Sequence, residues 1–117
     1  MSETMYAPEH PILHIYAQHT NHDPAYIAGN RAALQLLRDA LNTVLAADTE
    51  AIAAPEAMDN SGEGYAPFVI LFSQTDIEAL ALPYDWDGDP ATSEGKRPWD
   101  FPIVQAFARA LWAREPL

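Results

Sequence analysis

The chain of 117 residues is 49% hydrophobic and 10% aromatic, which is enough for one small domain with a single core and excludes a disordered composition. Its formal net charge of −11 argues against non-specific binding to nucleic acid or to an anionic membrane, because both require lysine and arginine. A basic protein partner or simple solubility fits that charge. The chain has no cysteine, so disulfides, thiolate metal sites and a cysteine nucleophile are excluded.

The N-terminal segment lacks the basic and apolar regions of a secretion signal, and no apolar run reaches the ~20 residues of a membrane helix. We therefore expect a cytoplasmic protein. Residues 1–10 are polar and contain proline, which predicts a flexible arm. Residues 11–117 are expected to form one α+β domain, because the sequence shows no repeat and no linker.

The first predicted elements are two strands and a helix. Residues 12–18 are rich in β-branched and aromatic side chains, which predicts a strand with His14 on one face, and residues 25–28 predict a short second strand after a turn. Asn30 is typical of a helix N-cap, so a helix is expected to begin there and to end near Ala47. Its predicted core-facing stripe consists of Ala33, Leu34, Leu37, Leu41, Val44 and Leu45.

The middle of the chain carries one weak and one strong strand signal. Residues 51–58 predict a strand that alanine and Pro55 weaken, and residues 59–64 predict a loop or hairpin turn. Residues 68–72 form an unbroken apolar run, which is typical of a central strand covered on both faces.

Two helices are expected to close the chain. Thr75 and Glu78 are spaced as a capping box, which predicts a short helix. After a long polar loop over residues 83–100, Asp100 is expected to begin the last helix with Pro102 just inside its start. The order β-β-α-β-β-α-α predicts an α+β fold, with a small antiparallel or mixed four-stranded sheet and helices packed on one face.

All four histidines lie in one short stretch, and this cluster is the first place to look for function. His19, His22 and the adjoining Asp23 could hold a zinc ion with an open position, but the spacing matches no zinc motif. We therefore expect no metal and no cofactor. His10 on the arm and His14 on a strand face are expected to be incidental to any site.

The same cluster fits one wall of a pocket for a small anionic ligand. It leads through a short strand to a helix start, where free N–H groups and the helix dipole suit a phosphate or carboxylate. The predicted wall consists of His19, Asn21, His22, Asn30 and Arg31. The opposite wall is predicted from a glycine-flanked carboxylate and from aromatic side chains that could stack on a base: Glu63, Tyr65, Tyr84 and Trp86.

Catalysis has little support in the sequence, and we name no catalytic residue. The chain contains no nucleophile elbow, no P-loop and no dinucleotide-binding glycine pattern. With 17 carboxylates, any chosen acidic pair carries no information. Hydrolysis of a nucleotide at a site built from histidine and Glu63 stays open.

Several short motifs resemble a family of small, mostly uncharacterised bacterial and phage proteins. They are His-Thr-Asn-His at 19–22, Tyr-Ile-Ala-Gly-Asn-Arg at 26–31, Gly-Glu-Gly-Tyr at 62–65 and Leu-Pro-Tyr at 82–84. The strand-Gly-Asn-Arg-helix segment also resembles small immunity proteins of polymorphic toxin systems. The resemblance implies a cytoplasmic protein of a bacterial cell or a phage-infected host. Small phage proteins of this size also include sponges that sequester nucleotide signals of immune defence.

Two functions follow as hypotheses. The first is a non-catalytic, homo-oligomeric protein that sequesters a small anionic, nucleotide-like signalling ligand, as a counter-defence sponge does. The second is an acidic immunity or inhibitor protein that neutralises a toxin or other basic partner. The acids expected to meet that partner are Asp85, Asp87, Asp89 and Glu94.

Overall fold

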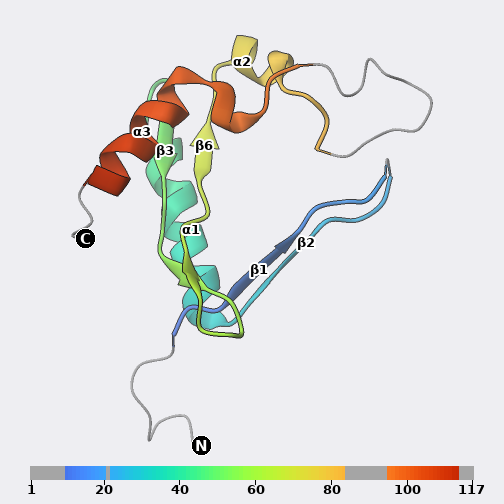
Figure 1. Ribbon diagram of the computed structural model, residues 1–117, viewed down its shortest axis with the longest axis vertical. Helices are drawn as coiled ribbons and strands as arrows, with labels where there is room; N and C mark the ends of the chain where they lie inside the picture. The colour runs from blue at the N-terminus through green and yellow to red at the C-terminus, as the bar shows by residue number, and fades with distance from the viewer. Residues whose placement is uncertain (1–9, 21, 84–94, 114–117) are drawn as a thin grey trace, which may run out of the picture. The chain divides into compact units, whose positions relative to one another are not determined.

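The computed structural model describes residues 10–20, 22–83 and 95–113, and the predicted arm lies almost wholly outside them. The chain forms two compact units, Met1–Ala17 with Pro24–Leu71 and Gln18–Asp23 with Phe72–Leu117. The class is α+β, with short antiparallel strands in small sheets and, in the described ranges, three α-helices (Figure 1). None of these helices is long and apolar enough to cross a membrane.

The first unit opens with an antiparallel pair, β1 (Leu13–Tyr16) and β2 (Tyr26–Gly29). Both strands were predicted: β1 is shorter at both ends than the expected residues 12–18, and β2 is shifted by one residue from the expected 25–28. Strand alternation places His14 and Tyr16 on one face, where their rings stack with centroids 5.8 Å apart. On the opposite face Ile15 is paired directly with Ile27.

Helix α1 (Arg31–Leu45) begins where the sequence predicted, because Asn30 caps it. The Asn30 Oδ1 atom accepts a hydrogen bond from the Ala33 N–H at 3.0 Å. Gly29 precedes the cap at a close approach of the chain: a Cβ atom there would lie 2.9 Å from the Ile12 carbonyl oxygen and 3.1 Å from the Ala33 Cβ. Glycine is therefore needed at this junction for space.

The predicted core-facing stripe of α1 is wrong for half of its members. The buried side chains are Ala33, Ala40 and Val44, whereas Leu34 and Leu41 are each 44% exposed and Leu45 is 69% exposed. Each exposed leucine follows a buried residue by one position, which turns its side chain by about 100° around the helix. Strands β3, β6 and β2 contact α1, and the residues of the helix that are buried are the alanines and the valine.

The predicted strand over residues 51–58 is broken into β3 (Ala51–Ala53) and β4 (Ala57–Met58) around Pro55, which lacks the N–H that a continuous strand would use. A further short strand, β5 (Gly64–Tyr65), pairs with β4. Strand β6 (Val69–Leu71) lies in the predicted apolar run but pairs only with β3 among the described strands. The expectation that it is a central strand is therefore wrong, and its residues are half-buried.

The described strands pair two by two, in the sheets β1-β2, β3-β6 and β4-β5, and a single four-stranded sheet is not confirmed. A parallel bridge between Ile12 and Met58 joins the start of β1 to β4. The core of this unit is formed by Leu13, Ala33 and Ala57. Figure 1 shows α1 lying along β3 and β6, with the β1-β2 ribbon running from the N-terminal end of the helix.

The second unit contains α2 (Gln74–Ala79), the 3-10 turn η3 (Pro98–Asp100) and α3 (Pro102–Ala113). The cap of α2 is Ser73, whose hydroxyl accepts from the Asp76 N–H, so the capping box predicted at Thr75 is wrong by two residues. Asp100 instead accepts from the Arg97 N–H and closes η3. Helix α3 begins at Pro102, two residues after the predicted start at Asp100, because Asp100 belongs to η3. Phe101, just before α3, and Val104 in its first turn are buried.

Candidate ligand-binding site

A hollow of about 450 Å³ lies over the N-terminal half of α1. It is lined by Gly29, Arg31, Leu34, Gln35 and Arg38. The helical residues are three, four and seven positions beyond Arg31, a spacing that places them on one face of a helix. Gly29 adds the end of β2 to this lining. The site is therefore built by one helix face and the strand that leads into it.

The hollow is basic and apolar at once. The side chains of Arg31 and Gln35 have no hydrogen-bond or ion-pair partner within the described part of the chain. Arg38 pairs with its neighbour Asp39 at 3.1 Å, but both side chains are more than 60% exposed. An ion pair in that setting contributes about 1 kcal/mol or less, so Arg38 can exchange its partner for an anionic ligand.

The predicted wall residue Asn30 is already engaged by the chain itself. Its Oδ1 atom accepts from the N–H groups of Ala33 and Ile12, and its Nδ2 atom donates to the His10 carbonyl at 2.7 Å. These bonds tie the residues before β1 to the start of α1. The structure thus gives Asn30 a clear positioning role beside Arg31.

The loop between β1 and β2 carries His19 and His22, which are both exposed. Thr20 Oγ1 donates to the Asp23 carboxylate at 2.9 Å, and His22 has a left-handed backbone with φ of 71°. No three histidine, aspartate or glutamate side chains in the described ranges are grouped to hold a metal ion. Asn21 lies outside those ranges. Because this loop belongs to the second unit, a wall that joins it to Arg31 remains a prediction.

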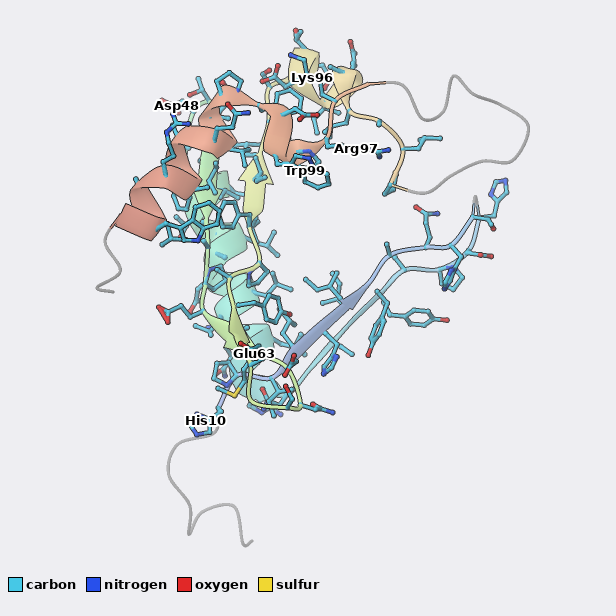
Figure 2. All side chains as sticks on the ribbon, viewed as in Figure 1. His10, Asp48, Glu63, Lys96, Arg97 and Trp99 are labelled. Carbon is cyan, nitrogen blue, oxygen red and sulfur yellow. The ribbon has the colours of Figure 1, made fainter. Side chains whose placement is uncertain are left out.

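The turn between β4 and β5 is organised by Asp59. Its Oδ1 atom accepts from the Ser61 hydroxyl, the Ser61 N–H and the Glu63 N–H. The Ser61 hydroxyl, followed by its N–H, holds the pKa of Asp59 below the ordinary value of 3.8. The Glu63 carboxylate is exposed, and Figure 2 shows it on this turn. Glu63 is thus presented to solvent on a firmly held loop.

A polar cluster around His14 was not expected from the sequence. His14 Nε2 donates to Asn60 Oδ1 at 3.2 Å, and His14 Nδ1 accepts from the Tyr16 hydroxyl at 3.2 Å, a tautomer assigned from these two partners. Tyr65 donates to the Leu13 carbonyl at 2.7 Å, and burial, followed by the charge of Asp59, raises its pKa above 10.0. Tyr65 was predicted to bind a ligand, and in the structure its hydroxyl instead links β5 to β1 by a hydrogen bond.

The remaining predicted residues, Tyr84, Asp85, Trp86, Asp87, Asp89 and Glu94, lie outside the described ranges. The structure adds Gln35 and Arg38 to the candidate site, and neither was among the residues predicted from the sequence. The sequence signal that could have identified them is their spacing of four and seven positions from Arg31, which places all three on one face of the helix. Comparison of the chain with protein-family models, curated proteins and solved structures found no match, so the resemblance to small bacterial and phage proteins stays a hypothesis.

Proposed function

We propose that this protein is a non-catalytic binding protein for a small anionic, nucleotide-like signalling ligand, and that the hollow on α1 receives the anionic group. The observation that supports this most is the convergence of Arg31 and Arg38 on one hollow, since the whole chain has only six basic residues. A protein of this kind, made in quantity, would act as a sponge for its ligand.

The distribution of charge supports the same site. From His10 to Arg38 the chain contains one acidic residue, Asp23, of its 17. The first turn of α1 has no acidic residue either. The nearest carboxylate to an anion at this end of the helix is that of Asp39, which follows this stretch and pairs with Arg38 at the surface, although the protein as a whole is strongly negative.

The chemistry of the lining suits a phosphate attached to an apolar group. Arginine presents a planar fork of N–H donors that matches phosphate oxygens, and the Gln35 amide can donate to a hydroxyl or a base. The half-exposed Leu34 supplies apolar surface beside them. A volume of about 450 Å³ lies in the range of ordinary small-ligand pockets, about 300–1,000 Å³.

Calorimetric titration with ATP, a cyclic dinucleotide and inorganic phosphate tests the proposal. Loss of a charge-assisted hydrogen bond costs about 1.5–3 kcal/mol, so Arg31→Ala and Arg38→Ala should each weaken binding by about tenfold or more. The matched control is Arg109→Ala, an exposed arginine on α3, which should bind as the unaltered protein does. The proposal is wrong if none of the three probes binds, or if both α1 variants keep full affinity.

The predicted histidine wall needs its own test. If the loop between β1 and β2 contributes to the pocket, a double change of His19→Ala and His22→Ala should reduce the affinity for the nucleotide that binds best. Unchanged affinity in that variant, beside a loss in Arg31→Ala, would place the ligand on α1 alone.

Exposed carboxylates favour a second candidate, an immunity or inhibitor protein. The side chains of Asp48, Glu56 and Glu63 are exposed and have no hydrogen-bond or ion-pair partner in the described ranges. Carboxylates free to meet a basic protein would speed its association, and added salt would weaken it. Changing Asp85, Asp87, Asp89 and Glu94 to lysine should abolish binding to a basic toxin partner. Binding that survives this reversal would rule the second candidate out.

A further inference from the structure

Strand β2 is an exposed edge with no charged residue. It pairs with β1 on one side, no described strand lies on its other side, and all four of its residues are exposed. Tyr26 is 58% and Ile27 is 59% exposed. A two-stranded ribbon is at best marginally stable in water, so an apolar ribbon of this kind gains from a further strand.

Natural sheet edges are usually protected by charged side chains or proline, and β2 contains neither. The outer side of β1 is different, because the Met58 N–H donates to the Pro11 carbonyl and the Tyr65 hydroxyl donates to the Leu13 carbonyl. Those bonds link β1 to β4 and β5. The open edge of the ribbon is therefore the one that β2 presents.

The backbone groups on that edge can be identified. In an antiparallel pair, successive residues direct their N–H and C=O groups to opposite sides of the strand. The Asn30 N–H donates to the Ile12 carbonyl, on the β1 side. Counting back along β2, Ile27 and Gly29 direct their backbone groups to the outer edge, where a further strand would meet them.

We propose that β2 pairs with β2 of a second copy of this chain, antiparallel and centred on Ile27. This register lets Ile27 exchange two backbone hydrogen bonds with the partner's Ile27. Because Ile15 is paired with Ile27 within each copy, four isoleucines then form a row across one face. On the other face the large Tyr26 lies opposite the partner's small Ala28. The result is a four-stranded sheet with the order β1-β2-β2-β1.

The distribution of charge lets a second copy approach at this edge. Two chains that each carry −11 repel one another over most of their surface, and they can meet only where acids are scarce. The stretch from His10 to Arg38 is such a region, since Asp23 is its only acid. A strand that pairs with itself also needs no other sequence to match it, because the two-fold register supplies the complement.

The proposed interface between the two β2 strands would also border the hollow of each copy. Gly29 lines the hollow and, in this register, lies opposite the partner's Ala25. Each ligand site would then have the partner's strand at its rim. This consequence rests on the proposed ligand function, but the strand pairing itself does not, and it is tested without any ligand.

Sedimentation velocity of the full chain gives the first test. The unaltered protein should sediment as a dimer of the 12.9 kDa chain, and Ile27→Lys should be a monomer with an unchanged circular dichroism spectrum. The control Ile77→Lys alters an isoleucine of similar exposure on α2 and should stay dimeric. An unaltered protein that is monomeric at about 100 μM, or an Ile27→Lys variant that stays dimeric, would overturn the pairing.

Cross-linking tests the register, since the chain has no cysteine of its own. In the proposed sheet the two copies of residue 27 are adjacent, whereas the two copies of residue 15 are three strand spacings, about 14 Å, apart. A short bismaleimide should therefore join Ile27→Cys into a covalent dimer and leave Ile15→Cys largely uncoupled. Equal coupling of both variants, or coupling of Ile15→Cys alone, would show that the register is wrong.

Discussion

At the scale of single residues, Asp59 shows how one carboxylate can hold a turn. It accepts three hydrogen bonds from Ser61 and Glu63, and these bonds stabilise its charged form more than its neutral form. They are therefore weaker when the carboxylate is protonated. Tyr65 follows this turn and its hydroxyl donates to the Leu13 carbonyl, so the turn that Asp59 holds leads directly into the attachment of β5 to β1.

This arrangement predicts how stability depends on pH. The pKa of Asp59 is lower in the folded protein than in the unfolded chain, so its contribution is complete above the unfolded pKa and is lost as the pH falls through the folded pKa. Asp59→Asn should therefore be less stable at neutral pH and lose less stability on acidification. Urea unfolding from neutral pH to pH 2 measures this. The control Glu63→Gln should show the same pH dependence as the unaltered protein. If Asp59→Asn loses as much stability on acidification as the unaltered protein does, the Asp59 hydrogen bonds do not contribute to the pH dependence.

At the scale of elements, α1 has two different apolar faces. One face, with Ala33, Ala40 and Val44, is buried in its unit, and the other, with Leu34 and Leu45, is exposed beside or beyond the ligand hollow. The larger side chains therefore lie on the outer face. Residue size alone would assign the faces the other way round.

A pair of alanine substitutions distinguishes the two faces. Val44→Ala removes two buried methyl groups and leaves a cavity, which should lower the free energy of unfolding by about 2 kcal/mol. Leu45→Ala removes more atoms from an exposed position and should change it by about 0.5 kcal/mol or less. Chemical denaturation of both variants gives the comparison. A larger loss in Leu45→Ala than in Val44→Ala would mean that the leucine face is the buried one.

Local signals in the sequence predicted that a helix starts and placed its first residue to within about two positions. The Asn30 cap is where the sequence placed it, whereas α2 begins two residues before and α3 two residues after the predicted start. The faces of α1 and the place of β6 depend instead on which segments pack against them. An apolar run does not determine how many strands will pair with it, and β6 pairs with one described strand, β3.

The candidate site was predicted in part for the same reason. Arg31 was expected to bind a ligand because it follows the cap, whereas Gln35 and Arg38 were not among the predicted site residues and line the hollow beside it. Their role depends on a hollow that Gly29 and the end of β2 complete. The His14 cluster was missed because its partner Asn60 is 46 residues away in the chain.

At the scale of the whole molecule, charge is divided unevenly along the chain. The stretch from His10 to Arg38 has one acid, and 14 of the 17 acids follow it, among only four of the six basic residues. Repulsion among those carboxylates opposes the compact state. The same division leaves the acid-poor stretch, with α1 and the β1-β2 ribbon, as the surface that an anionic ligand or a second copy can approach.

The charge imbalance predicts that salt stabilises this protein. Raising NaCl from 0.01 M to 0.15 M shortens the screening length from about 30 Å to about 8 Å, which weakens repulsion between distant carboxylates more than the contacts within the core. The Tm should therefore rise by several degrees.

Replacing the exposed acids Asp48, Glu56 and Glu63 by their amides should raise the Tm at low salt and make the further rise with salt smaller. Thermal unfolding in NaCl and in KCl separates screening from binding of a particular cation. A Tm that falls with salt, or that rises equally in the amide variant, would mean that carboxylate repulsion does not limit stability.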